Sequence, residues 1–193
     1  ELGVRAWAQG WWEMPRTVGD EVAPLLGARP GEVAMVPNVS LAQAAVVSAL
    51  DFSGDRDAIV TTDLDFPSVR YVYDGLGARL GARVVSVPSD DDGLTIDTDR
   101  LLAAIDERTR LVAVPHVLFR SAYVMDAARI CARAREVGAL VSLDAYHAVG
   151  VIPVDVHALG VDFYVGGVLK WLCGGPGGAF LWVRPELADR LGP

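Results

Sequence analysis

Cysteine, lysine and long hydrophobic runs are all scarce in this sequence of 193 residues, and each scarcity excludes a class of protein. Two cysteines, Cys131 and Cys173, are too few for a disulfide framework and fit a reduced, cytoplasmic protein. No apolar run approaches the ~18 residues of a membrane-spanning helix, and no signal-peptide pattern opens the sequence, so we expect no membrane partner. The 17 basic residues are outnumbered by 25 acidic ones, which argues against a nucleic-acid partner because phosphate binding needs clustered basic side chains.

Apolar residues are abundant instead. They make up 52% of the sequence, which is enough surface to bury to exclude a disordered chain. The length predicts one domain or a large part of one, because domains commonly hold ~100–200 residues. The sequence begins with Glu1 and stops at Pro193 without a tail, so we expect a fragment or an incompletely ordered chain, with a part of the active site outside it.

Apolar strands alternate with helices along most of the chain. Apolar runs predict strands at 33–37, 58–62, 83–88, 111–115, 140–144, 163–167 and 180–183. Helical spacing and capping residues predict helices at 3–27, 38–50, 68–80, 97–105 and 126–137. Because the strands are apolar on both faces and helices separate them, the expected fold class is α/β, with a mostly parallel sheet sandwiched by helices. Ligand sites in such folds gather beyond the carboxyl ends of the strands, so polar residues there are the candidates.

Lys170 is the only lysine, since the other 16 of the 17 basic residues are Arg. Arg stays protonated at any relevant pH, whereas a desolvated Lys amine can lose its proton and attack a carbonyl group. Lys170 lies in an apolar, Gly-rich segment, 166–178, where we expect the amine to be desolvated and nucleophilic. The glycine spacing fits neither a dinucleotide fingerprint nor a phosphate-binding loop, since Trp171 follows the lysine. In the alternative interpretation the glycines only form tight turns and the lysine extends into solvent.

Asp144 ends an expected strand and precedes Lys170 by 26 residues. A carboxylate followed by a lysine in this way matches a site that binds an aldehyde cofactor as an imine and keeps the cofactor's pyridine nitrogen protonated. Taken alone, Asp144 is more simply a helix N-cap, and His147 a packing histidine. His116, at a strand end, is a further candidate for the site, whereas His157 is expected in a solvated loop.

Asn38, Val39 and Ser40 open the helix that follows the first expected strand. The free N–H groups and the positive dipole end of such a helix form a seat for an anion, most naturally a phosphate group, with the Ser40 hydroxyl as an extra donor. The alternative is an ordinary N-cap, which is the commoner role of Asn or Ser there. Phe66 follows the second expected strand and either offers an aromatic face to a planar ring or packs in the core.

Several segments of the chain share a pattern with one known family. They are 142–150, 151–155, 160–163, 170–172 and 174–177, with Trp11-Trp12 and 31–33 nearer the start. In these segments the sequence resembles kynureninase and, more broadly, the class V aminotransferase family of fold-type-I pyridoxal-phosphate enzymes. The resemblance implies that residues 1–193 are the large cofactor-binding domain, with residues 1–30 as an N-terminal helical segment. The family's C-terminal small domain, which supplies an Arg for the substrate carboxylate, is absent from this sequence and is expected to follow it.

The resemblance also implies a role for each candidate residue. Lys170 would form the internal aldimine with pyridoxal 5'-phosphate, and Asp144 would pair with the pyridinium nitrogen. His147 would lie beside the cofactor's phenolic oxygen or phosphate. The Val39-Ser40 pair would receive the phosphate, and Phe66 would stack on the ring.

Some positions depart from the kynureninase pattern. Leu169 stands where the family usually has a phosphate-binding Tyr, and Val69 stands where a carboxylate near the ring is usual. Pro115-His116 replaces a Thr-His or Ser-His pair, and Ser121-Ala122 replaces a Thr-Gly pair. These changes leave the cofactor site recognisable and bear on the identity of the substrate.

The resemblance implies a lyase or hydrolase that acts on an L-amino acid, cleaves the Cβ–Cγ bond of a kynurenine-like side chain with water and releases alanine. A C–S lyase or cysteine desulfurase reaction, or transamination, is the alternative among enzymes. A non-catalytic cofactor-binding relative is the alternative of another class, against which the intact Lys170, Asp144 and His147 argue. The expected partners are a small-molecule amino acid and a second copy of the chain, since the family builds its site at a homodimer interface.

Overall fold

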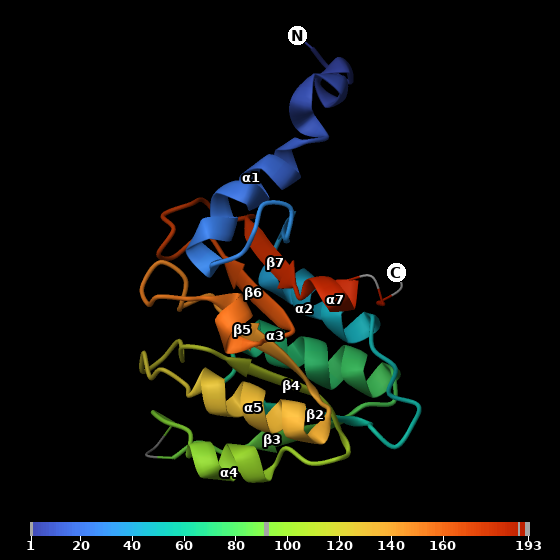
Figure 1. Ribbon diagram of the computed structural model, residues 1–193, viewed down its shortest axis with the longest axis vertical. Helices are drawn as coiled ribbons and strands as arrows, with labels where there is room; N and C mark the ends of the chain where they lie inside the picture. Colours follow the sequence, from blue (N-terminus) through green and yellow to red (C-terminus); the bar gives the residue numbers. More distant parts are fainter. Residues whose placement is uncertain (1, 91–92, 189, 192–193) are drawn as a thin grey trace.

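Seven strands form one sheet in the computed structural model, which describes residues 2–90, 93–188 and 190–191 (Figure 1). The strands are β1 (Val33–Val36), β2 (Ala58–Thr62), β3 (Arg83–Val87), β4 (Thr109–Pro115), β5 (Leu140–Asp144), β6 (Phe163–Gly167) and β7 (Ala179–Val183). Their order across the sheet is β1-β7-β6-β5-β4-β2-β3. Strands β2 to β6 pair in parallel, and β7 runs antiparallel to both β6 and β1. The prediction of an α/β fold with a mostly parallel sheet is confirmed.

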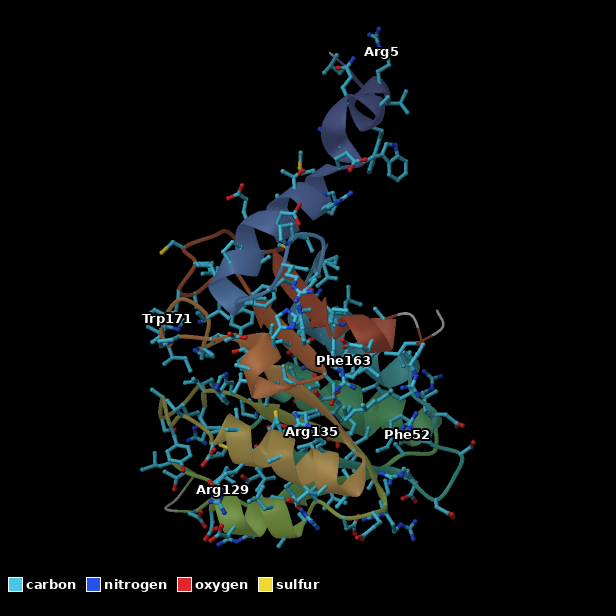
Figure 2. All side chains as sticks on the ribbon, viewed as in Figure 1. Arg5, Phe52, Arg129, Arg135, Phe163 and Trp171 are labelled. Carbon is cyan, nitrogen blue, oxygen red and sulfur yellow. The ribbon has the colours of Figure 1, made fainter. Side chains whose placement is uncertain are left out.

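Helices cover both faces of the sheet. On each face a hydrophobic cluster lies between the helices and the strands. The helices are α1 (Met14–Val22), α2 (Val39–Ser48), α3 (Pro67–Val72), α4 (Thr98–Ala103), α5 (Ala127–Val137), α6 (Val156–Leu159) and α7 (Pro185–Ala188). Residues of α2, α3 and α7 pack in one cluster, and residues of α1, α4, α5 and α6 pack in the other. Figure 2 shows Phe163 within the body of the molecule, whereas Arg129 and Arg135 project from α5.

The strands are apolar on both faces because both faces are covered. In β4, Leu111 and Ala113 belong to the α2/α3 cluster, whereas the alternate residues Val112 and Val114 belong to the α4/α5 cluster. This alternation follows from the two-residue period of a strand, which points successive side chains to opposite faces. Among the residues described, no helix is long and apolar enough to cross a bilayer.

Side-chain caps set where several helices begin. The Asn38 side chain accepts a hydrogen bond from the Leu41 N–H at 2.9 Å, and Asp126 accepts one from the Arg129 N–H at 3.1 Å. Each cap satisfies one backbone donor that the first turn of a helix leaves without an intrahelical partner. The local sequence, through the Asn38 cap, therefore determines that α2 begins soon after β1.

The N-terminal segment is not the single helix expected at 3–27. It consists of a π-helical turn at Trp7–Trp11, then α1, then a 3₁₀ turn at Ala23–Leu26. The break falls at Gly10, whose φ of 120° is a conformation that glycine adopts easily, and Pro15 then sits in the first turn of α1. In Figure 1 the part of this segment before α1 extends away from the sheet, so it lacks the tertiary packing that would hold one continuous helix, whereas the end of α1 and the 3₁₀ turn are packed in the core.

Candidate cofactor-binding site

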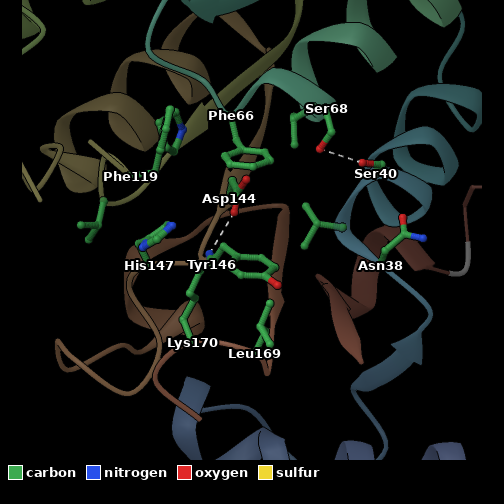
Figure 3. Close-up of a pocket in the computed structure, with 14 residues that line it drawn as sticks. Asn38, Ser40, Phe66, Ser68, Phe119, Asp144, Tyr146, His147, Leu169 and Lys170 are labelled. Carbon is green, nitrogen blue, oxygen red and sulfur yellow. Dashed lines mark hydrogen bonds between the residues drawn. The ribbon is translucent and has the colours of Figure 1, made fainter. Parts of the chain in front are cut away.

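A cavity of about 260 Å³ lies where β4, β5 and β6 end and where α2 and α3 begin (Figure 3). Its lining residues are Asn38, Val39, Ser40, Phe66, Ser68, Val69, Pro115, Val117, Phe119, Asp144, Tyr146, His147, Leu169 and Lys170. All six residues that the sequence nominated for the cofactor line this one cavity, although they come from four separate parts of the chain. Their individual roles stay predictions, and the geometry below shows what each is able to do.

Asp144 is the last residue of β5 and opens onto the cavity. Its Oδ1 accepts a hydrogen bond from the Tyr146 N–H at 2.9 Å, and the residues after it form turns rather than a helix. The ordinary helix N-cap is therefore excluded for this carboxyl group. Surrounding protein desolvates the carboxylate, which raises the pKa of Asp144 to about 6. A half-buried carboxylate with one neutral donor is stabilised by a cationic ligand, such as a protonated ring nitrogen.

Lys170 follows β6 and lines the same cavity as Asp144. The residue is exposed, so this chain does not supply the desolvation that the apolar, Gly-rich segment predicted. The segment loops outward, and Trp171 beside the lysine is 55% exposed as well. His147 is half-buried, and its pKa is lowered by burial and by the charge of Lys170. The imidazole is therefore neutral near pH 7, able to donate a hydrogen bond from one ring nitrogen and accept one at the other.

The first turn of α2 forms the opposite end of the cavity. Val39 is buried, and the Ser40 hydroxyl donates a hydrogen bond to the Ser68 Oγ at 3.0 Å. The Asn38 side chain accepts a hydrogen bond from the Leu41 N–H. The backbone N–H groups of Val39 and Ser40 therefore remain available as donors at the N-terminus of this helix. Such a terminus favours an anion, because unpaired N–H groups and the positive end of the helix dipole act together.

Two phenylalanines form an aromatic wall of the cavity. Phe66, at the start of α3, is 48% exposed and meets Phe119 edge to face, with ring centroids 5.2 Å apart. Phe66 is therefore not part of the buried core, which was the alternative for it. Phe119 lies in the loop after β4 and carried no local signal in the sequence, because its direction depends on how that loop folds back.

A second carboxyl group, Asp65, lies buried beneath the cavity floor. It shares with Asp144 a small cavity of about 10 Å³, the size of a single water molecule. The Thr62 hydroxyl donates to Asp65 Oδ1 at 2.6 Å. Burial raises the pKa of Asp65 to about 8, and the charge of Asp144 adds to this effect. The sequence carries a signal for this residue, because Asp65 lies just after an apolar strand, where polar residues are candidates for the site.

The other two histidines lie outside this cavity. His116 is buried after β4, and its Nδ1 is hydrogen-bonded to the Tyr164 hydroxyl at 2.8 Å. Burial lowers the pKa of His116 to about 4, so it is a neutral structural histidine. His157 was expected in a solvated loop; it is exposed to solvent as expected, but the loop was wrong. It lies in α6, where its Nε2 is 2.9 Å from Glu32 Oε2.

An acid, an amine and a helix N-terminus around one cavity at the carboxyl edge of an α/β sheet are the groups that a pyridoxal-phosphate-binding domain needs. Comparison with known proteins then identifies the family. Residues 12–193 match the family model described as Aminotransferase class-V, and the chain belongs to that family. Members of this family depend on pyridoxal phosphate.

Two relatives by sequence extend this result. The chain is 42% identical over 174 residues to "Uncharacterized aminotransferase YcbU" from Bacillus subtilis (strain 168), covering 90% of this chain and 45% of the relative. It is 35% identical over 197 residues to a kynureninase from Pseudomonas fluorescens, covering 96% of this chain and 45% of that protein. The chain thus spans about half the length of these relatives.

Solved structures show the same fold. The chain superposes on the apo structure of a cysteine desulfurase from Thermococcus onnurineus NA1 with a TM-score of 0.82 and 27% identity, covering all of this chain and 48% of the other. A complex of the cystine C-S lyase C-DES gives a TM-score of 0.86 at 24% identity, covering 97% of this chain and 50% of the other, which shows a shared fold.

Proposed function

We propose that the protein containing this chain is a pyridoxal-phosphate-dependent enzyme that acts on an L-amino acid, with Lys170 as the covalent attachment point. The reaction is a kynureninase-like cleavage of the Cβ–Cγ bond with water, which releases alanine. The observation that carries the proposal is that Lys170 and Asp144 line one cavity with a helix N-terminus at its far end. A non-catalytic relative would not need to keep both the amine and the acid.

The residues present fit the cofactor. When bound, pyridoxal phosphate accepts the electron pair left by a bond broken at the substrate's α-carbon. Asp144, with a pKa of about 6, is largely ionised at pH 7 and would hold a proton on the ring nitrogen by charge. The amides of Val39 and Ser40 would receive the phosphate, and Phe66 would face the ring.

Two side chains would move protons at the reacting end. The Lys170 amine, freed when the substrate amine takes its place, would carry a proton at Nζ between substrate atoms. His147 is neutral near pH 7, so it would donate a hydrogen bond to the phenolic oxygen without adding a second positive charge beside Lys170.

Sequence similarity supports an aryl substrate. The chain is 35% identical to a kynureninase from Pseudomonas fluorescens, whereas the apolar wall of Phe66 and Phe119 beside Asp144 faces the space assigned to the cofactor ring. Cysteine desulfurase or C–S lyase chemistry is the second candidate, and the fold shared with a cysteine desulfurase at 27% identity favours it. Transamination is the third, since the relative from Bacillus subtilis is called an aminotransferase.

We expect the complete protein to be a cytoplasmic homodimer with its site at the interface. The free thiols of Cys131 and Cys173 support a reducing compartment. Three exposed tryptophans, Trp7, Trp11 and Trp12, give the N-terminal segment an apolar surface of the kind that a second subunit covers. Size-exclusion chromatography with light scattering on the full-length protein tests the oligomeric state.

Borohydride reduction tests the attachment point. Reducing the purified full-length protein should fix the mass of the cofactor on the peptide that contains Lys170, and this chain offers no other lysine to confuse the assignment. The Lys170→Ala variant should show no such adduct and should lose at least about 10³-fold in kcat, because no other amine replaces it. A colourless protein whose Lys170 stays unmodified would refute the proposal.

Substrate assays then separate the candidate reactions. Addition of kynurenine should produce the fluorescence of anthranilate together with alanine. Release of sulfide or persulfide from cysteine, with no reaction of kynurenine, would instead establish the second candidate. Conversion of a 2-oxo acid to an amino acid would establish the third.

A further inference from the structure

An apolar side chain, Leu169, lines the cavity directly before Lys170. It lies beside Lys170 and Tyr146 in Figure 3 and offers no hydrogen-bond donor. The two polar side chains of the α2 terminus are already engaged, since Asn38 caps Leu41 and the Ser40 hydroxyl donates to Ser68. A dianionic group at this end would therefore gain from one further donor.

Tyr146 lines the same cavity, and its hydroxyl points into it. Figure 3 shows the phenol reaching past Asp144 toward the space between Leu169 and Asn38. Among the described residues Tyr146 donates a hydrogen bond only from its backbone N–H, to Asp144, and its hydroxyl has no protein partner. A half-buried hydroxyl that faces a cavity without a partner is free to bind a ligand atom.

The position of the Tyr146 ring is determined by Gly167. A Cβ built on Gly167 would lie 2.7 Å from Cζ and 2.9 Å from Cδ2 of Tyr146, so the ring occupies the space that a larger residue would fill. The hydrogen bond from the Tyr146 N–H to Asp144 Oδ1 at 2.9 Å fixes its backbone as well. The hydroxyl is thus held in place from two strands, β5 and β6, at whose ends these residues lie.

We infer that Tyr146 is a cofactor-binding residue whose hydroxyl donates a hydrogen bond to the phosphate group, the contact that Leu169 is unable to make. The inference rests on the proposed function, because it requires pyridoxal phosphate in this cavity. A hydrogen bond to a charged acceptor is worth enough to change a dissociation constant by about 10- to 100-fold.

The test compares a ligand that has the phosphate with one that lacks it. In the full-length protein, Tyr146→Phe should raise the dissociation constant of pyridoxal phosphate by about 10- to 100-fold and leave that of pyridoxal unchanged within about twofold. The matched control is Tyr71→Phe, because Tyr71 is 74% exposed and outside the cavity, and it should leave both constants unchanged. Gly167→Ala, which displaces the ring and keeps the hydroxyl, should reproduce the phosphate-selective loss.

Rescue makes the test specific. Adding Leu169→Tyr to the Tyr146→Phe variant returns a phenol to the same end of the cavity and should recover most of the lost affinity for pyridoxal phosphate. Equal weakening of both ligands by Tyr146→Phe would show a merely structural role, and no weakening of either would show no contact; each result overturns the inference. A wild-type protein that binds neither ligand would instead refute the proposed function, so the two failures are distinguishable.

Discussion

At the scale of single residues, two carboxyl groups with different partners lie at and beneath the floor of the cavity. Asp144 opens onto the cavity, where a ligand cation is able to compensate its charge. Asp65 lies deeper and accepts its hydrogen bond from Thr62, and the charge of Arg70 only partly opposes the effect of burial. The buried Tyr73 also lines the small cavity between the two acids. Asp65 is therefore the acid whose ionisation the fold opposes most.

This difference predicts how stability depends on pH. A carboxyl group whose pKa is higher in the folded than in the unfolded state contributes fully at low pH, and that contribution is lost as the pH rises to the folded-state value. For Asp65 the window extends from the ordinary value of 3.8 to about 8. The free energy of unfolding of the cofactor-free protein should fall across this window. In Asp65→Asn, the decrease in the free energy of unfolding between pH 5 and pH 9 should be smaller than in the wild type by about 2 kcal/mol or more.

Urea unfolding of the full-length protein at pH 5, 7 and 9 measures this effect. Asp74→Asn is the control, because Asp74 is an exposed carboxylate near the same helix, and it should leave the pH dependence unchanged. Identical pH dependence in the wild type and in Asp65→Asn would show that Asp65 is ionised without penalty and would contradict this account.

At the scale of elements, the close packing of α1 on β1 anchors the N-terminal segment to the sheet. Gly19 is the buried glycine of α1 that faces β1, and a Cβ at this position would overlap the carbonyl oxygen of Val33. The helix lies so near the strand because this side chain is only a hydrogen atom. The sequence shows a glycine in a helix, which by propensity alone is unfavourable, and only the packing explains it.

Substitution of this glycine should separate packing from helix propensity. Gly19→Ala should lower the free energy of unfolding by about 1–3 kcal/mol, because the added methyl group pushes α1 away from a backbone atom that has no alternative position. Gly75→Ala is the matched control, since a Cβ at that position would meet no atom within 4 Å, and it should be neutral or slightly stabilising. Thermal unfolding of both variants is the measurement, and a stable Gly19→Ala protein would disprove the close contact.

At the scale of the whole molecule, a cluster around Glu32 joins segments that are far apart in the sequence. The carboxylate of Glu32 accepts hydrogen bonds from the Trp182 indole at 3.1 Å and from the Arg29 N–H at 3.0 Å, and its Oε2 lies 2.9 Å from His157 Nε2. Burial opposes ionisation, but these hydrogen bonds together lower the pKa of Glu32. The cluster ties the turn before β1 to α6 and β7, on the sheet edge away from β3.

Removal of this carboxylate should weaken the whole sheet edge. Glu32→Ala leaves the indole N–H of the buried Trp182 without a partner, so the free energy of unfolding at pH 7 should fall by about 1–3 kcal/mol. Because the pKa of Glu32 is lowered by folding, its contribution is present above the ordinary value of 4.5 and is lost at lower pH, where wild type and variant should converge. Glu21→Ala, at an exposed position of α1, is the control in the same denaturation experiment.

Local sequence patterns predicted most of the strands of the sheet and most of the residues that line the cavity. The predictions that were wrong have physical causes. Uninterrupted apolar runs locate strands that are buried on both faces, and the seven expected strands agree with the observed ones to within two residues at each end. The helix expected at 3–27 is broken because Gly10 and Pro15 interrupt it, and the part before α1 extends away from the sheet. The one-turn helices α6 and α7 are too short to leave a periodic signal.

The residues missed in the site share one property. Phe119 and Tyr146 lie in loops or turns after strands, where no periodicity tells whether a side chain faces inward. The exposure of Lys170 was missed for the same reason, since an apolar, Gly-rich composition does not reveal that a loop extends outward.

By itself, the sequence determined the fold class and nominated the residues that we propose to carry the chemistry, because strand burial, helix caps and the identities of Lys170 and Asp144 are properties of short stretches of chain. Only the tertiary structure decided which of these residues meet. The parallel strands end at one edge of the sheet, so side chains more than a hundred residues apart line a single cavity. Burial at that edge, which no local pattern contains, also decided that Asp65 and Asp144 are so much weaker acids than carboxyl groups in water.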